Sequence, residues 1–472
     1  MPFDLKEILS DSLGGARALH EAHVNPMLAR VLEMIGFQHE YVRGSGCYLT
    51  TLDGREIFDG LSGYGVFGMG RNHPAIRQAI HQALDMDLPN LAQMDCALLS
   101  GLLAKKLISL APGHRLQHVF FTNSGTESVE GAIKFARAAS QRPRILFSQG
   151  AFHGLSTGSL ALNGDESFRE GFGDLLPGCV KIDMEDVEAV RRELETNTVA
   201  AVIIEPVRGK GVFYPKDDSV YPAIQRICRE TETFFIVDEI QSGLGRTGKW
   251  WACQHWNLEP DILVTAKALS GGLIPIGAIL YSHDVYKKVY SRLDRCVVHS
   301  STFGQNLIAM VAGLASIHLL EEENLIERSA QMGERLLSGL SSLQEKHEFI
   351  KEVRGKGLMI GVEFGPPKSL LLKPAWAILH SVENGLFAQA VVMQLYDKHN
   401  ILTQVAGHHQ EVVKLLPPFV MREEEADRLV SALDAVLIEC RRFPGPIWSV
   451  GKQLAGAAAK QHLFSREKAH TT

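Results

Sequence analysis

The chain has 472 residues, 45% of them hydrophobic and 22% charged, which are ordinary values for a globular protein of two or three packed units. Its formal net charge of -6 excludes nucleic acid and anionic membranes as partners attracted by bulk charge, and no run approaches the ~18 apolar residues of a membrane span. Seven scattered cysteines without a CxxC spacing indicate neither a disulfide framework nor a metal site, and a start without an apolar signal stretch predicts a cytoplasmic protein.

The middle of the chain alternates between the patterns of helices and buried strands. Val129, Ala132, Ile133 and Ala136 fall on one face of an expected helix, and a second helix is expected over 220–231. Four short apolar runs are expected to be strands: 199–206, 234–239, 261–265 and 277–281. Because these runs are continuously apolar, they predict an α/β fold whose mostly parallel sheet is covered by helices.

The last third of the chain is typical of a smaller α+β domain. Two long helices are expected within 305–347, followed by a strand at 357–364, a helix near 388–398, a strand at 412–418 and a helix at 423–441. We therefore divide the chain into an N-terminal segment that joins the small domain (1–74), a large domain (75–330), the small domain (331–455) and a tail expected to be flexible (456–472).

The stretch TNSGTESVEGAIKFA (122–136) opens a helix with small residues. Backbone N–H groups at a helix N-terminus bind anions, so Ser124, Gly125 and Thr126 are candidates for a phosphate site. The alternative is an ordinary helix cap, because Ser and Thr begin many helices. The sequence leaves both interpretations open.

Two further residues suit a bound aromatic ring. Asp238 ends the apolar run FFIVD, where a carboxylate is costly to bury without a cationic partner. A protonated pyridine nitrogen would be such a partner, and a salt bridge to Arg246 is the alternative. Phe152, between glycines in GAFHG, can lie flat against a ring or can be a simple core residue.

Lys267 directly follows an apolar run in VTAKALSGG. Desolvation lowers the pKa of a lysine and makes its amine a nucleophile able to form a Schiff base; the alternative is a lysine that reaches solvent from a strand end. Gly271 and Gly272 are expected to clear space around it. A phosphate cradle, a stacked aromatic, a partner for a ring nitrogen and a Schiff-base lysine together match the needs of pyridoxal 5'-phosphate (PLP).

Two glycine-rich stretches are not interpreted as nucleotide sites. GYGVFG (63–68) lacks the buried strand and the following helix of a dinucleotide-binding motif. GLGRTGKW (243–250) places Trp250 where a phosphate-binding loop needs a magnesium-binding hydroxyl.

Six motifs resemble, in order, those of the class III (omega) aminotransferases, which are PLP enzymes of fold type I. They are FFTNSGTESVEGAIK, GAFHG, IIEPVRGKG, FFIVDEIQSGLGRTGKWWA, PDILVTAKALSGGLIPIGA and SSTFGQN. The likeness runs from about residue 60 to 440 and is strongest to putrescine and ornithine aminotransferases. It implies a seven-stranded, mostly parallel sheet in the large domain and a homodimer with shared active sites.

The resemblance also implies roles for individual residues. Lys267 matches the lysine of the internal aldimine, which also shuttles the proton, and Asp238 matches the partner of the ring nitrogen. The other implied cofactor contacts are the phosphate loop Ser124, Gly125 and Thr126, the stacking residue Phe152 with its neighbour His153, the acid Glu205, Gln241 beside the phenolic oxygen, and Thr302 from the second subunit. No metal is implied.

The chain departs from the ornithine-type pattern where the substrate would bind. Those enzymes carry QGE where this chain has RGK, with Arg208 and Lys210, and Lys414 stands where they carry an arginine. An arginine grips a carboxylate with two hydrogen bonds, whereas a lysine is a point charge. Tyr64, Arg208, Lys210 and Lys414 are therefore the candidate substrate contacts, and Gln305 is expected near the cofactor phosphate.

The implied activity is a ping-pong transfer of an amino group between a primary, terminal amine or amino acid and a carbonyl acceptor, with 2-oxoglutarate or pyruvate as candidate acceptors. An apolar segment, 373–409, leaves two interpretations open: domain packing, which we favour, or a passage for a long substrate, with His408 and His409 beside it. The passage would suit a long apolar or lipid-like aldehyde, such as a hopanoid side chain, aminated by an amino acid. A racemase or decarboxylase of the same fold, or a non-catalytic binding protein, are further alternatives.

Overall fold

The structure is a computed structural model, which describes residues 3–92, 94–442, 444–445, 448–449, 451, 454 and 456. Residues 457–472 of the expected flexible tail lie outside the described residues. No helix within the described ranges is long and apolar enough to cross a membrane.

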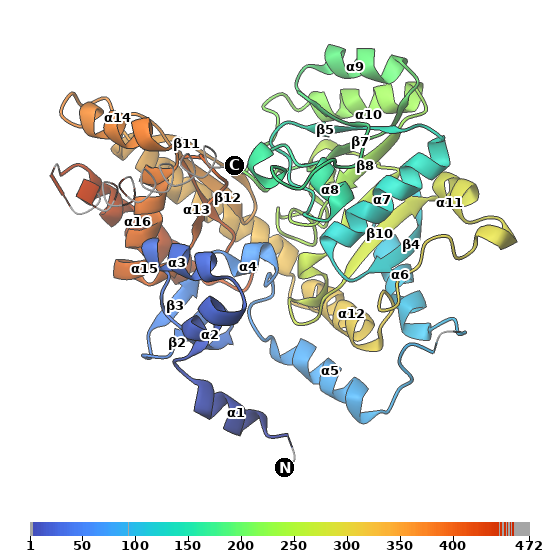
Figure 1. Cartoon of the computed structure of the whole chain (residues 1–472), viewed down its shortest axis with the longest axis horizontal. Coiled ribbons are helices and arrows are strands. Elements are labelled where there is room, and N and C mark those ends of the chain that lie inside the picture. Colours follow the sequence, from blue (N-terminus) through green and yellow to red (C-terminus); the bar gives the residue numbers. More distant parts are fainter. Residues whose placement is uncertain are drawn as a thin grey trace, which may run out of the picture.

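A seven-stranded sheet forms the centre of the large lobe (Figure 1). Its strands, in spatial order, are β4 (Leu116–Thr122), β10 (Gly277–Ser282), β9 (Ile262–Thr265), β8 (Phe234–Asp238), β7 (Val199–Ile204), β5 (Arg144–Ser148) and β6 (Cys179–Ile182). Only β10 runs antiparallel to its neighbours in this sheet. The predicted fold, a mostly parallel seven-stranded sheet with fold-type-I architecture, is confirmed.

The sheet is buried on both faces because successive residues of its central strands enter different cores. Val202, Phe235 and Leu263 belong to one hydrophobic cluster. Their neighbours Ile203 and Ile236 belong to a second cluster on the opposite face. This arrangement explains why the sequence of each strand is continuously apolar instead of alternating.

Helices cover both faces of the sheet. The expected helix around Val129 is α7 (Gly125–Ser140), which packs into the second cluster, and the helix expected at 220–231 is α10 (Val220–Glu230), which packs into the first. The other helices of this lobe are α5 (Pro74–Asp85), α6 (Leu98–Ser109), α8 (Thr157–Ala161), α9 (Val187–Glu195), α11 (His283–Val289) and α12 (Leu307–Glu322). Short 3-10 turns span Glu166–Phe168, Ala252–Trp256, Lys267–Ser270 and Leu293–Arg295.

The C-terminal lobe is built on a four-stranded antiparallel sheet. Its order is β11 (Ile350–Lys356), β12 (Met359–Phe364), β15 (Val412–Leu415) and β14 (Gln404–Val405). The helices are α13 (Leu325–Lys346), α14 (Lys373–Val382), α15 (Leu386–His399) and α16 (Glu423–Cys440). This is the α+β pattern that the sequence predicts for the last third of the chain.

The N-terminal segment joins this C-terminal lobe through a shared sheet. Its elements are α1 (Leu5–Ser12), α2 (Ala16–His23), α3 (Pro26–Met34), β1 (Tyr41–Ser45), β2 (Tyr48–Thr51), β3 (Glu56–Asp59) and α4 (Ser62–Gly65). Strand β3 pairs in parallel with β13 (Ile401–Leu402), so the blue N-terminal elements lie beside the orange C-terminal ones in Figure 1. The division at residues 74, 330 and 455 stays a prediction.

Most of the apolar segment 373–409 packs inside the C-terminal lobe. Trp376, Leu379 and Phe387 are buried in the main core, and the rings of Phe349 and Phe387 stack with centroids 5.0 Å apart. Two parts of the segment reach the large cavity described below: the start of α15 with the residues just before it, and strand β14 with the loop after it. The structure therefore favours the packing interpretation for the helical part of this segment.

Candidate active site

A cavity of about 1280 Å³ lies where the large sheet meets the C-terminal lobe. Parallel strands present their carboxyl ends at one edge of a sheet, and binding sites form there. The sequence motifs follow the ends of β4, β5, β7, β8 and β9, and the cavity brings together from them Ser124, Gly125, Thr126, Phe152, His153, Glu205, Asp238, Gln241 and Lys267. These residues are far apart in the sequence, and strand topology alone places them together.

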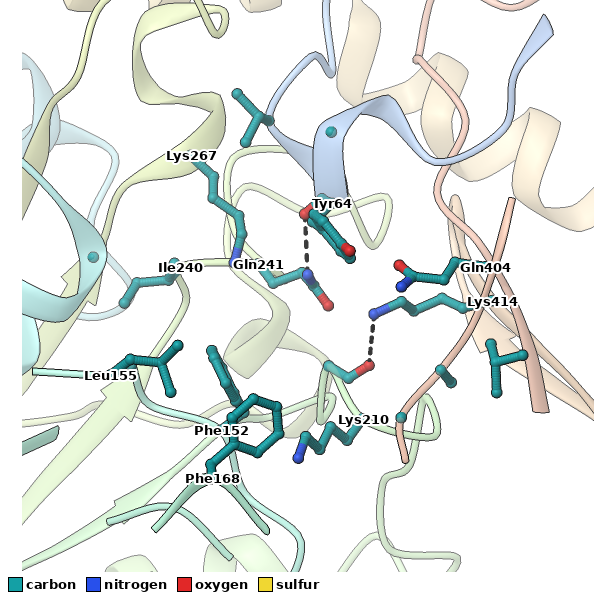
Figure 2. Close-up of a pocket in the computed structure, with 18 of the residues that line it drawn as sticks. Tyr64, Phe152, Leu155, Phe168, Lys210, Ile240, Gln241, Lys267, Gln404 and Lys414 are labelled. Atoms are coloured by element: carbon teal, nitrogen blue, oxygen red, sulfur yellow. Dashed lines mark hydrogen bonds between the residues drawn. The ribbon is translucent and has the colours of Figure 1, made fainter. Parts of the chain in front are cut away.

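Lys267 begins a 3-10 turn directly after β9, with its amine toward the cavity (Figure 2). Its φ of 39° is a left-handed value that a non-glycine residue adopts at a cost, which is a feature of functional sites. Burial lowers the pKa of Lys267, although the charges of Asp238 and Glu205 oppose that shift. The amine has no hydrogen-bond or ion-pair partner in the part of the chain that the structure describes, so it is available for chemistry.

Asp238 ends β8 and pairs with a histidine, not with an arginine. Its Oδ2 lies 2.7 Å from His153 Nδ1, and its Oδ1 accepts a hydrogen bond of 3.0 Å from the Ile240 N–H. Burial would lower the pKa of His153, but the hydrogen bond to Asp238 and its charge outweigh burial and raise it. Arg246, the alternative partner, is buried elsewhere and donates to the carbonyls of Leu358 and Pro417.

Ser124 caps the start of α7, and the expected anion site at the same helix end stays open to the cavity. Ser124 is the N-cap, and its hydroxyl accepts from the Glu127 N–H at 3.2 Å. The N–H groups of the first helical residues, Gly125 and Thr126, have no partner within a helix, and both residues line the cavity. The Thr126 hydroxyl is held 2.6 Å from that of Ser159. Two interpretations that the sequence left open are thus compatible.

Glu205 and Gln241 organise the middle of the cavity. Glu205 is buried and accepts from the N–H groups of Phe152 (2.9 Å) and Gly209 (2.8 Å), which fixes the loop that carries Phe152. Burial raises the pKa of Glu205. Gln241 donates through Nε2 to the Tyr64 carbonyl at 3.0 Å, and its buried Oε1 has no partner among the described residues.

These groups fit PLP. The unpartnered amine of Lys267 and the unpartnered Oε1 of Gln241 face one cavity with a carboxylate, Asp238, and a helix N-terminus at Gly125. When bound, PLP supplies an aldehyde that takes up an amino group and a ring that withdraws electrons. Lys267, Asp238 and the α7 N-terminus would hold its aldehyde, ring nitrogen and phosphate. No cluster of three His, Cys, Asp or Glu side chains in the described ranges could hold a metal ion.

Three of the four candidate substrate residues line the cavity, and Arg208 does not. Tyr64, Lys210 and Lys414 line it. Lys414 is buried, donates to the Gly209 carbonyl at 3.0 Å and lies 5.7 Å from the Tyr64 ring centre. Arg208 does not line the cavity: its guanidinium lies over Phe213, 4.0 Å from the ring centre, and donates to the Gln149 carbonyl.

Burial lowers the pKa of Lys414 to about 8, and the nearby charges of Lys267 and Lys210 act in the same direction. Glu205 opposes the shift without cancelling it. Lys414 is therefore a cation whose charge changes close to neutral pH. No carboxylate forms an ion pair with it in the described part of the chain.

Thr302 and Gln305 lie outside the cavity of the single chain. Thr302 is exposed, as a residue that reaches a second subunit would be. Gln305 accepts from the Ser100 hydroxyl at 2.8 Å, and it does not line the cavity. His408 and His409 do line it, at the rim.

The glycines after Lys267 form a left-handed turn against close neighbours. Gly271 and Gly272 have φ values of 62° and 83°, and an added Cβ would lie 2.3 Å from Ile76 at Gly271 and 2.5 Å from Phe67 at Gly272. Gly272 also lines the cavity, and the expectation that these glycines clear space for the chemistry of Lys267 stays a prediction.

Sequence reasoning missed several cavity residues, among them Leu155, Phe168 and Gln404. Phe168 lies in the 3-10 turn Glu166–Phe168, sixteen positions beyond Phe152, and no periodicity links the two. Gln404 lies on a two-residue strand. Only the three-dimensional arrangement identifies them.

Comparisons with known proteins identify the family of the chain. The family described as aminotransferase class-III matches residues 34–437. Aminotransferase PigE from a Serratia species is 33% identical over 451 residues, covering 89% of this chain and 53% of that protein, so the chain spans about half the length of that relative. Ornithine aminotransferase from Toxoplasma gondii has a TM-score of 0.80 at 25% identity and covers 92% of this chain and 98% of its own.

A second solved structure with the same fold contains PLP. It is an amine transaminase from an uncultivated Pseudomonas species in its PLP-bound form, with a TM-score of 0.76 at 26% identity, covering 85% of this chain and 95% of its own. The family match covers most of the chain, and it favours amino-group transfer over racemisation or decarboxylation. The chain belongs to the class-III aminotransferases, which are PLP-dependent enzymes.

Proposed function

We propose that this aminotransferase transfers an amino group by a ping-pong mechanism from an amino acid or a primary, terminal amine to a carbonyl acceptor. The observation that carries the proposal is the unpartnered Lys267 amine, which faces the same cavity as the buried Asp238–His153 pair. The first supplies a nucleophile and base, and the second supplies a fixed negative charge where a ring nitrogen would lie.

The residues of the site divide the work between binding and proton transfer. When PLP is bound, Gly125 and Thr126 would hold its phosphate through backbone N–H groups, and Phe152 would cover one face of its ring. Asp238 would hold the ring nitrogen in its protonated form, and His153 holds the carboxylate in place. Lys267 Nζ would act as the base that accepts a proton from the amine-bearing carbon of the donor and later gives it back, and it would do the same in reverse for the acceptor.

Lys414 is the proposed partner of a donor carboxylate. It is buried, lines the cavity and lacks an ion-pair partner in the described ranges, so a substrate carboxylate would offset its desolvation. A lysine binds with one point charge, so amino acids are expected to bind less tightly than they would to an arginine. 2-Oxoglutarate and pyruvate are the acceptors that this charge would suit.

A second candidate is the amination of a long apolar or lipid-like aldehyde, such as a hopanoid side chain, by an amino acid. The supporting observation is the apolar lining of the cavity beyond the reacting groups. Val31, Met34 and Ile35 contribute from α3 and its end, and Leu386 contributes from α15.

We also propose a cytoplasmic homodimer in which Thr302 of one subunit reaches the phosphate of the other. The exposure of Thr302 in the single chain supports this arrangement. The surface around it carries exposed apolar side chains, including Val297 and Phe303, which a subunit contact would cover.

The function is tested with a panel of donors and acceptors. Protein loaded with PLP is mixed with diamines, amino acids or simple amines, and the absorbance of the cofactor is followed. A donor should convert the aldehyde form to the amine form, and a keto acid or aldehyde should restore it. A protein that binds PLP but never interconverts these forms would sink the proposal, and a colourless protein would indicate a non-catalytic role.

A further inference from the structure

A bridge of charged and aromatic side chains crosses the rim of the cavity. Lys210 Nζ lies 2.7 Å from Asp165 Oδ2, and His408 Nδ1 lies 3.4 Å from the same oxygen. His408 Nδ1 also lies 2.9 Å from the Ser167 hydroxyl. Asp165 and Ser167 belong to the large lobe, whereas His408 lies between β14 and β15 of the C-terminal lobe. The bridge therefore joins the two lobes beside the site.

The bridge holds the ring of Phe168 from two directions. The imidazole of His408 stacks on this ring, with centroids 4.8 Å apart and planes inclined by 19°. The ammonium of Lys210 lies 4.1 Å from the centre of the same ring. The rings of Phe168 and Phe152 also meet edge to face, with their centroids 5.6 Å apart. A side chain with contacts of this kind has little freedom to rotate away from the cavity.

Phe168 forms an apolar wall opposite the polar side of the cavity. In Figure 2, Phe168, Phe152 and Leu155 lie together, and Lys414 and Gln404 lie on the other side. Lys210 adds no free charge to the apolar wall, because its ammonium is bound to Asp165 and to the aromatic ring. A substrate between the walls would meet a cation on one side and hydrocarbon on the other.

We propose that Phe168 is a specificity-determining residue that binds an unbranched apolar chain of the carbonyl substrate, and that Lys210 and His408 are positioning residues that hold its ring. The inference rests on the proposed function and names a substrate class for it: aldehydes with an alkyl chain. Lys210 thus acts on the substrate through Phe168 and not as the partner of a carboxylate.

The test compares butanal with octanal as acceptors, using one amino-acid donor and PLP-loaded enzyme. A chain that packs on the ring gains up to about fourfold in kcat/KM per methylene group, so we expect a wild-type octanal-to-butanal ratio on the order of 10 to 100. Phe168→Ala should lower that ratio about tenfold, mostly through the KM of octanal. Phe172→Ala is the matched control, because Phe172 lies four positions later, is 71% exposed and does not line the cavity.

The positioning role of Lys210 is measured separately, through the KM values of octanal and butanal. Lys210→Met should raise the KM of octanal more than that of butanal, and Lys210→Arg should restore the wild-type ratio because a guanidinium can bind Asp165 and lie on the ring. A general loss of structure would affect both aldehydes equally and would not be rescued by arginine.

The octanal-to-butanal ratios of the variants decide whether Phe168 binds the alkyl chain. Equal ratios in wild type, Phe168→Ala and Phe172→Ala would overturn the inference while leaving the aminotransferase proposal intact. If Phe168→Ala does not purify as folded protein, Phe168→Leu carries the test, with an intermediate ratio expected and a wild-type ratio overturning the role of the ring. A wild-type enzyme that accepts no amino group from any donor would overturn the proposed function instead.

Discussion

Asp238 and His153 are joined by a 2.7 Å contact between Oδ2 and Nδ1, and both side chains are buried. The two residues come from different strand ends, β8 and the loop after β5. The Asp238 carboxylate raises the pKa of the His153 imidazole, although burial acts in the opposite direction. The contact with Asp238 therefore favours the protonated form of His153 despite the apolar surroundings. The other ring nitrogen, Nε2, has no partner among the described residues, which leaves His153 held through Asp238.

Asp238→Asn tests the charge of this pair without changing its shape. We expect kcat to fall by about 100-fold or more, because the ring nitrogen loses the anion that keeps it protonated. The pKa of His153 should fall as well, since its largest raising influence is removed. Single-turnover absorbance kinetics measure the first effect, and NMR titration of the histidine measures the second. An asparagine variant with wild-type kcat would contradict the role of Asp238.

Lys267→Ala tests the nucleophile. Turnover should fall by more than about a thousandfold, because the other two lysines of the cavity are already held, Lys210 by Asp165 and Lys414 by the Gly209 carbonyl. The folded variant should still bind PLP through Gly125, Thr126 and Asp238, without the absorbance of the lysine-linked form. Lys216→Ala is the control, since the Lys216 side chain is 82% exposed and lies outside the cavity. Full activity in Lys267→Ala would refute the assignment.

The lowered pKa of Lys414 predicts that the KM of donors with a carboxylate depends on pH. Its pKa is lowered to about 8 by burial, so its ammonium is present below pH 8 and is lost as the pH rises through that value. The KM of an amino-acid donor should therefore rise above about pH 8, whereas the KM of an amine without a carboxylate should not follow the same curve.

Lys414→Arg gives the matched comparison. A guanidinium stays charged across this range and can grip a carboxylate with two hydrogen bonds. We expect improved use of α-amino acids, about tenfold in kcat/KM, and loss of the transition near pH 8. Steady-state kinetics from pH 6.5 to about 9.5 measure both. An unchanged donor preference and pH profile would remove Lys414 from the substrate site.

A shared dimer site can be tested by complementation between two inactive variants. Lys267→Ala removes the nucleophile, and Thr302→Glu places a negative charge where the partner's phosphate would bind. In a mixed dimer one site has both defects, and the other has neither. With random assortment, co-expression should restore about a quarter of wild-type activity. No restored activity in purified mixed dimers would contradict the exchange of Thr302 between subunits.

Much of the fold follows from the sequence because a two-sided buried sheet leaves a strong local signature. The runs at 199–206 and 234–239 are continuously apolar, since alternate residues such as Val202 and Ile203 enter cores on opposite faces. The helix cap at Ser124 is equally local, because its hydroxyl accepts a hydrogen bond from the N–H of Glu127, only three residues further along the chain. Such signals need no knowledge of distant residues.

The sequence by itself determined the reaction chemistry, and only the tertiary structure decided how its residues are paired. Lys267 and Asp238 stand out because each is a polar residue at the end of a buried apolar run. The partner of Asp238 could not be read in the same way: the sequence offered Arg246, and the fold placed His153 against it, because contacts between strand ends depend on strand order. Phe168 and its bridge of Lys210, Asp165 and His408 likewise join loops from two lobes. Local patterns carry no information on such distances, so the groups that would recognise the substrate emerged only once the chain was folded.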